Sequence, residues 1–104
     1  MSMDTLEHLV SFYKALGDET RLRLVVLLAQ QAPGRAMCVG RLARELDTTM
    51  SNVSQHLRVL KDLGLLHGER RRHRVHYYLD AERLADYISL TRELLGEQFV
   101  YEEV

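Results

Sequence analysis

A helix with a polar beginning, near the middle of the chain, constrains the fold more than any other feature. Residues 38–47 predict a short helix with apolar residues on one side. After a brief polar connection, a second helix is predicted over 50–63. Its first turn carries small polar residues, namely Ser51, Asn52, Ser54 and Gln55, and its later half carries Leu57, Leu60 and Leu63 at core spacing. Such a helix packs at one end and offers hydrogen-bonding groups to an external groove at the other, so the pair predicts a helix-turn-helix.

A basic hairpin is predicted directly after this second helix. Gly64 marks the end of the helix, as glycine often does at a C-terminal cap. From Val75 to Leu79, apolar residues occupy every second position, which is typical of a strand with one buried face. Two short strands within 65–79 would flank an arginine-rich tip at 68–74. A helix-turn-helix over 38–63 followed by this hairpin predicts a winged helix.

Three more helices complete a single domain of 104 residues. They are predicted over 4–16, 19–31 and 81–98, with Gly17 ending the first and Asp18 capping the next. The helix over 19–31 is apolar over a wide face and is expected to be central. The fold class is therefore mainly α with a small β-hairpin, in the order of four helices, two strands and one helix.

The first and last helices predict a homodimer. Each keeps an apolar stripe that a three-helix core with a wing cannot fully cover, and large uncovered apolar patches are rare on monomers. We expect these helices, over 4–16 and 81–98, to pack against their mates across a two-fold axis. Two recognition helices about 34 Å apart would then fit an inverted repeat in double-stranded DNA. The alternative is that both helices simply complete the core of one chain.

Charge is distributed unevenly along the chain. The whole chain has a net charge of −1, yet residues 41–79 carry a net +4 and residues 80–104 a net −5. The positive segment is the one predicted to hold the helix-turn-helix and the wing, where phosphate contacts need cations. This coincidence favours a nucleic-acid surface over an ordinary solvated face.

Composition excludes several classes of protein. Hydrophobic residues make up 46% of the chain, which excludes the disordered class. No apolar run approaches the roughly 18 residues of a transmembrane helix, so no membrane partner is expected. The N-terminus lacks signal-peptide features, and the single cysteine cannot form an internal disulfide, both of which suit a cytoplasmic protein.

Two other functional classes fit less well. No Ser-His-Asp arrangement, glycine-rich phosphate loop or carboxylate pair is evident, so we expect neither enzymatic activity nor a cofactor. A winged helix that binds only proteins has no need of four arginines within residues 70–74. Salt-dependent binding to a duplex would separate these alternatives.

Three ordered segments resemble the ArsR/SmtB family of winged-helix repressors. Residues 16–24 are similar to the family's L-x-D-x-T-R-L-R segment, residues 51–65 to its recognition helix, and residues 74–79 to its second wing strand. The resemblance implies a dimeric repressor of the predicted element order that leaves its operator when an inducer binds.

The resemblance also implies the DNA contacts. On the recognition helix these are Thr49, Met50, Ser51, Asn52, Ser54, Gln55, His56 and Arg58, and on the wing they are Arg70, Arg71, Arg72 and Arg74. Met50 departs from the family pattern, because a polar residue, often glutamine, is common there. Methionine cannot make the bidentate base contact of glutamine, which leaves a different base or a thymine methyl group as its partner.

The family's two common metal sites are predicted to be lost. One is Cys-Val-Cys followed by an acidic residue, whereas this chain has Gly40 and Arg41 after Cys38 and Val39. The other uses histidines of paired last helices, but no histidine follows His76. A soft metal needs two or three thiolates, and zinc prefers His and Cys.

Cys38 leaves three interpretations open. It is an unregulated thiol, a redox-responsive thiolate favoured by Arg35 and Arg41, or a metal ligand together with His8 of either subunit. The inducer, the operator sequence and the regulated genes do not follow from the sequence.

Overall fold

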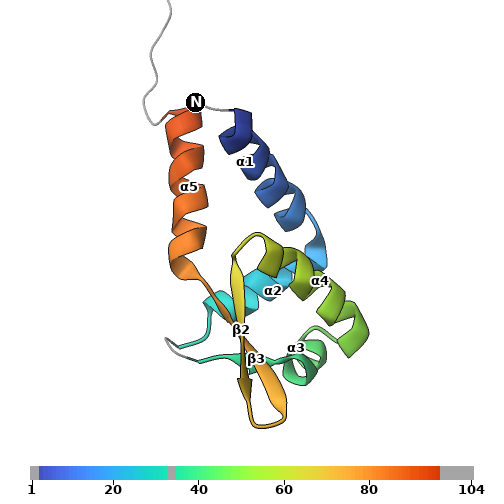
Figure 1. Ribbon diagram of the computed structural model, residues 1–104. Coiled ribbons are helices and arrows are strands. Elements are labelled where there is room, and N and C mark those ends of the chain that lie inside the picture. Colours follow the sequence, from blue (N-terminus) through green and yellow to red (C-terminus); the bar gives the residue numbers. More distant parts are fainter. Residues whose placement is uncertain (1–2, 33–34, 97–104) are drawn as a thin grey trace, which may run out of the picture.

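The protein is described by a computed structural model that covers residues 3–32 and 35–96 (Figure 1). Its elements, in chain order, are α1 (Met3–Leu16), α2 (Glu19–Ala29), β1 (Met37–Cys38), α3 (Val39–Glu45), α4 (Met50–Asp62), β2 (Leu66–Arg71), β3 (Arg74–Leu79) and α5 (Ala81–Leu95). The predicted order of four helices, a hairpin and a final helix is confirmed. The short strand β1 is an addition.

The predicted helix ends differ slightly from the observed ones. Helix α2 ends at Ala29, two residues before its predicted end, and α3 is shorter than the predicted 38–47. The predicted last helix reaches 98, and its final residues lie outside the described part of the chain. Helices commonly loosen in their last turn, and residue spacing does not locate that change.

Gly64 ends α4 as predicted, and the backbone explains why a glycine is needed. Its φ is 74°, in the left-handed region that side chains disfavour. The N–H of Gly64 donates to the carbonyl of Lys61 at 2.8 Å, and the N–H of Leu65 donates to that of Leu60 at 3.1 Å. These two bonds form a Schellman motif, which satisfies the last carbonyls of the helix and turns the chain into β2.

The hairpin lies where it was predicted, but its strands are longer and its turn is tighter. Strands β2 and β3 pair from Leu66 opposite Leu79 as far as Arg71 opposite Arg74. The predicted tip at 68–74 is therefore wrong in extent, because its first four residues belong to β2. Exposed polar strands pair through the backbone, so their sequence carries no alternating apolar pattern.

Strand β1 makes the hairpin part of a three-stranded sheet of order β1-β3-β2. Met37 pairs with Tyr77 and Cys38 with His76. A two-residue strand has no period that the sequence could reveal. It nevertheless fixes the start of α3 against the wing.

The core lies where α1, α2, α3, α4 and the base of the hairpin meet. Its buried members are Leu9, Phe12, Ala15, Leu24, Val25, Leu28, Met37, Leu42, Ala43, Val53, Leu57, Leu60, Leu65, Leu66 and Tyr87. Helix α2 packs against α1, α4 and β3, as expected of a central helix, but only part of its apolar face is buried: Leu24 and Val25 are covered, whereas Leu22 and Val26 are exposed. The sequence shows that this helix is apolar over a wide face, but not which part a neighbour covers.

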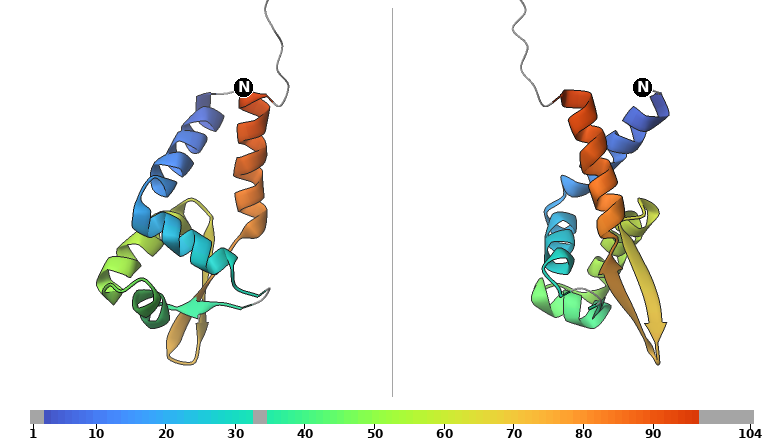
Figure 2. Two further views of the ribbon diagram at one scale, coloured as in Figure 1. Left: turned by 180° about the vertical axis from the view of Figure 1, so that it is seen from behind. Right: turned by 90° about the vertical axis from the view of Figure 1, so that its left-hand side faces the viewer.

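Helices α1 and α5 extend away from the wing, as both rotated views confirm (Figure 2). The hairpin turn, α3 and the start of α4 lie at the opposite end (Figure 1). In the described residues, no helix is both long and apolar enough to cross a membrane.

Candidate nucleic-acid interface

The turn before α4 is built by local hydrogen bonds. Asp47 has a φ of 53°, and the N–H of Thr48 donates to the carbonyl of Ala43 at 3.0 Å, which reverses the chain after α3. Thr49 then caps α4, because its hydroxyl accepts the N–H of Asn52 at 3.1 Å. The short turn holds the beginning of α4 at a fixed angle to α3.

Helix α4 has one buried and one exposed face. Val53, Leu57 and Leu60 are fully buried, at the i, i+4 and i+7 positions of one stripe. The exposed side carries Thr49, Met50, Ser51, Ser54, Gln55 and Arg58. Six of the eight residues predicted to meet DNA from this helix and its cap thus reach solvent.

Asn52 and His56, the other two predicted contacts, are partly buried. The amide of Asn52 donates to the hydroxyl of Thr48 at 3.1 Å. Nδ1 of His56 lies 3.2 Å from Nη1 of Arg21 on α2. Both side chains are therefore held by neighbours in the protein.

The four wing arginines are all exposed, but they are not equivalent. Arg72 occupies the turn with a φ of 58°. Arg71 forms an ion pair with Glu69 at 2.8 Å, a pairing expected for residues two apart on one strand face. Arg74 lies beside Cys38 and, with Met50, lines a hollow between α3, α4 and β3.

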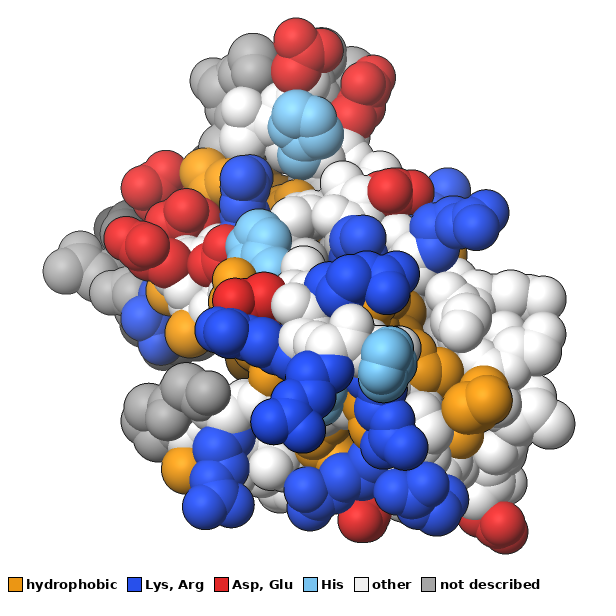
Figure 3. All heavy atoms as spheres, turned by 60° about the horizontal axis from the view of Figure 1, so that its bottom comes forward, with side chains coloured by type: hydrophobic (Ala, Val, Ile, Leu, Met, Phe, Trp, Pro, Cys, Tyr) orange, Lys and Arg blue, Asp and Glu red, His pale blue; other side chains and the backbone are white. Residues whose placement is uncertain are grey.

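Basic side chains gather on the end of the molecule that holds the hairpin turn and the start of α4. Figure 3 shows this end with Lys and Arg spread across it and acidic groups at its edges. Arg41 and Arg44 of α3 are exposed as well, although they were not among the residues predicted to contact DNA. The sequence could have indicated them as candidate DNA contacts, because both lie in the positively charged segment over 41–79.

The Cys38 thiol is partly exposed at the start of α3. The backbone N–H of Arg41 lowers the pKa of this thiol most, and the charge of Arg74 lowers it further, against partial desolvation that raises it. The predicted neighbour Arg35 is not among these causes. The thiolate is thus favoured, chiefly by the helix backbone.

The described part of the chain gathers no set of candidate metal ligands. Within residues 3–32 and 35–96, no three His, Cys, Asp or Glu side chains lie close enough to hold an ion. The candidates Cys38 and His8 are separated in one chain, since α1 and α3 lie at opposite ends (Figure 1). The carboxylate of Asp80 instead pairs with Nε2 of His67 at 2.7 Å, which is the largest cause lowering the pKa of Asp80.

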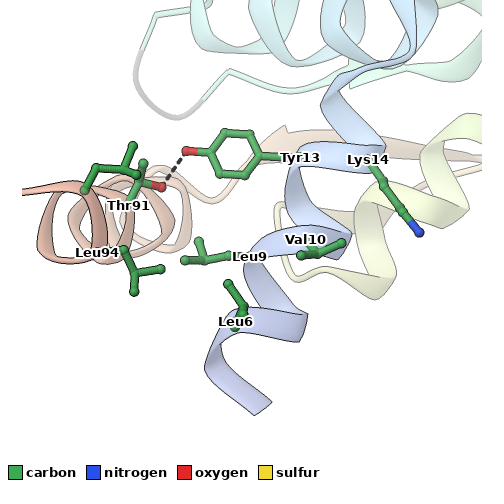
Figure 4. Close-up of a pocket in the computed structure, with 8 residues that line it drawn as sticks. Leu6, Leu9, Val10, Tyr13, Lys14, Thr91 and Leu94 are labelled. Carbon is green, nitrogen blue, oxygen red and sulfur yellow. Dashed lines mark hydrogen bonds between the residues drawn. The ribbon is translucent and has the colours of Figure 1, made fainter. Parts of the chain in front are cut away.

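An apolar groove of about 450 Å³ runs between α1 and α5. Leu6, Leu9, Val10 and Leu94 are among its lining residues, and Figure 4 shows Leu9 pointing from α1 toward Leu94, with Tyr13 and Thr91 joined by a hydrogen bond. Leu6, Val10 and Tyr13 are 44%, 45% and 48% exposed, respectively. The predicted apolar stripe of α1 is thus divided between the core and this groove.

Comparisons with known proteins identify the family. A helix-turn-helix domain model matches residues 16–69, about half of the chain. The chain is 33% identical over 92 residues to an uncharacterized HTH-type transcriptional regulator of Methanocaldococcus jannaschii, a match that covers 88% of this chain and 100% of the relative. It is also 37% identical over 70 residues to the arsenical resistance operon repressor of Escherichia coli, covering 67% of this chain and 57% of the repressor.

This chain belongs to the ArsR family of helix-turn-helix transcriptional regulators. A solved structure agrees: the homodimeric winged helix-turn-helix DNA-binding domain from Mycobacterium bovis superposes with a TM-score of 0.68 and 25% identity, over 95% of this chain and 88% of that one. The ArsR-family chain is thus a DNA-binding winged helix, and its family and fold are those of regulators rather than enzymes.

Proposed function

We propose that this ArsR-family regulator is a repressor that binds an inverted-repeat operator as a homodimer. The observation that carries the proposal is the exposed polar face of α4, anchored by Val53, Leu57 and Leu60 at the basic end of the molecule. Such a helix fits the major groove, where its side chains meet base edges. The E. coli relative is named an operon repressor, which supports repression as opposed to activation.

The dimer is supported by the groove between α1 and α5. Its apolar residues are exposed in one chain, and a second copy would cover them across a two-fold axis. The M. bovis domain of the same fold is homodimeric. We accordingly divide the single domain of 104 residues into a helix-turn-helix over 38–63, a wing over 65–79, and dimerisation helices over 4–16 and 81–98.

Within the interface, base edges and phosphates are read by different parts. Ser51, Ser54 and Gln55 have the polar groups for base edges, while Met50 offers an apolar contact to a thymine methyl group. The wing arginines supply phosphate or minor-groove contacts and general affinity.

Footprinting on the DNA upstream of the protein's own gene tests the proposal. We expect protection of an inverted repeat whose half-sites lie about one helical turn apart.

Gln55→Ala should weaken operator binding by about 1–3 kcal/mol and relax the choice at one base position. Equal weakening on operator and random DNA would make Gln55 a contact to the DNA backbone. A parent protein that binds no duplex DNA would contradict the proposed function.

The wing should contribute charge rather than sequence choice. Glu69→Gln removes the carboxylate that pairs with Arg71, so binding to operator and to random DNA should both strengthen about two- to fivefold at low salt. Arg71→Ala should weaken both and lower the salt slope by about one. Titrations across a salt series measure these effects, and an unchanged slope in Arg71→Ala would show that this wing position does not reach a phosphate.

We also propose that the common family metal sites are lost. In the part of the chain that the structure describes, the single thiol of Cys38 and the scattered histidines provide no multidentate ligand set that could prefer one dimer geometry over another. Zinc, cadmium and arsenite at low micromolar concentration should therefore change operator affinity by less than about twofold. Stoichiometric zinc binding that releases the operator would contradict this and point to Cys38 with His8 of the other subunit.

Oxidation of Cys38 is the alternative route of regulation, favoured by the lowered pKa of the thiol. If it operates, peroxide should release the parent protein from DNA but leave Cys38→Ser bound.

A further inference from the structure

One guanidinium group connects three helices, α1, α2 and the recognition helix α4. Arg21, in the first turn of α2, donates from Nε to the carbonyl oxygen of Ala15 in α1 at 2.8 Å. Its Nη1 lies 3.2 Å from Nδ1 of His56 in α4. Arg21 and His56 are partly buried, and the His56 side chain is 18% exposed. Arg21 therefore connects the end of α1, whose groove face we assign to the dimer contact, with the helix assigned to DNA.

The chemistry of this contact fixes the state of the imidazole. Arginine has donors and no acceptor, so Nδ1 of His56 must accept the hydrogen bond, and the neutral ring then carries its proton on Nε2. The carboxylate of Asp18 is not a hydrogen-bond partner of Nδ1, because the two lie 3.9 Å apart. It accepts the backbone N–H of Arg21 at 3.0 Å instead. The bond thus fixes both the tautomer and the orientation of His56.

The α1 side of the contact has its own physical reason. Ala15 lies in the last turn of α1, where carbonyl groups lack a partner within the helix, and besides Arg21 its carbonyl accepts the N–H of Asp18 at 3.4 Å. A cation near such carbonyls is favourable because the C-terminal end of a helix carries partial negative charge. Arg21 therefore satisfies the end of α1 and holds α4 with the same rigid, planar group.

We propose that Arg21 is a positioning residue for operator recognition, which acts by fixing α4 relative to α1 through Nδ1 of His56. The proposal rests on the function proposed above. Base readout requires α4 to enter the groove at one angle, whereas phosphate contacts tolerate small rotations. Loss of the contact should therefore reduce operator binding much more than binding to random DNA.

Two substitutions of His56 form the central test. Asparagine places an amide oxygen close to the position of Nδ1 and can still accept from Arg21, whereas glutamine extends beyond that position. His56→Gln should lower operator affinity about tenfold and His56→Asn by less than about threefold, as expected for one hydrogen bond to a charged group. Random-sequence DNA should be bound by both variants within about twofold of the parent chain.

Arg21 itself is tested with a matched control. Arg21→Ala should lose about as much operator affinity as His56→Gln, and the double variant should lose no more, because both substitutions remove the contact between Nη1 of Arg21 and Nδ1 of His56. Arg23→Ala is the control: Arg23 has the same charge two residues along α2, but pairs with Glu19 at the surface at 2.9 Å. Sedimentation and thermal unfolding of each variant verify that it is a folded dimer.

Nitrogen NMR of the free protein reports the tautomer independently of DNA. In the parent protein we expect Nδ1 of His56 to accept a hydrogen bond and Nε2 to carry the proton. The hydrogen bond to Nδ1 should be lost in Arg21→Ala. Equal operator affinity of the His56→Asn and His56→Gln variants, additive losses in the double variant, or a proton on Nδ1 would each overturn the proposal. A parent chain that binds no duplex would instead remove the proposed function.

Discussion

Val10→Glu is expected to convert the protein to a monomer and to abolish operator binding at concentrations that saturate the parent chain. Val10 lies in the apolar groove between α1 and α5 and is 45% exposed in one chain. A two-fold axis would bring both new carboxylates into the interface, where burial of a charge is costly even beside Lys14, which also lines the groove. Since such burial costs several kcal/mol, dimerisation should weaken by at least about 100-fold.

Val26→Glu is the matched control for this prediction. Val26 is 46% exposed on α2 and lies outside the groove, so the same change in volume and charge should leave the dimer intact. Sedimentation at micromolar concentration distinguishes a 12.1 kDa monomer from a dimer. A dimer that persists in Val10→Glu but dissociates in Val26→Glu would move the interface from α1 and α5 to α2.

Phe12→Ala should remove about 3–5 kcal/mol from the free energy of unfolding, within the range for truncating a buried aromatic side chain. Phe12 is 2% exposed and stacks on Tyr87 of α5, with ring centroids 4.4 Å apart and planes inclined by 10°. The hydroxyl of Tyr87 donates to the carbonyl of Leu63 at 3.1 Å, just after α4. The stack therefore joins α1 to α5 and to the end of the recognition helix.

This loss would be a large share of the total stability of a domain, which is typically about 5–15 kcal/mol. Urea unfolding at one fixed protein concentration measures it, because the stability of a dimer depends on concentration. Phe12→Leu keeps most of the apolar volume and should cost less than about 1.5 kcal/mol. Equal losses in the two variants would mean that the apolar volume kept by leucine contributes nothing and that the aromatic stack accounts for the whole loss.

The site itself was only partly predictable. The exposed face of α4 follows from the sequence, because the positions of Val53, Leu57 and Leu60 leave the polar residues on the other side. The partner of Arg21 did not follow: His56 is 35 residues away, and nothing in the local pattern joins them. The resemblance to the family included Arg21 in a motif but gave no contact for it.

The wing shows the same division. Its basic charge follows from four arginines in residues 70–74, and the Glu69–Arg71 pair agrees with a strand whose alternate residues share a face. The His67–Asp80 pair depends on where β2 meets the start of α5, and therefore on tertiary packing.

The sequence by itself determined the order of the five helices and the hairpin and the polar start of the recognition helix, and its resemblance to known motifs indicated the family. The elements follow from the spacing of residues close together in the chain, because helical and strand periods and glycine caps are local properties. Tertiary structure alone decided which apolar residues of α1 are covered. Leu9 and Phe12 enter the core while Leu6 and Val10 line the groove, because burial depends on where α5 and α2 lie against α1. It likewise placed Arg21 between α1 and α4, since a contact among three helices exists only after they pack.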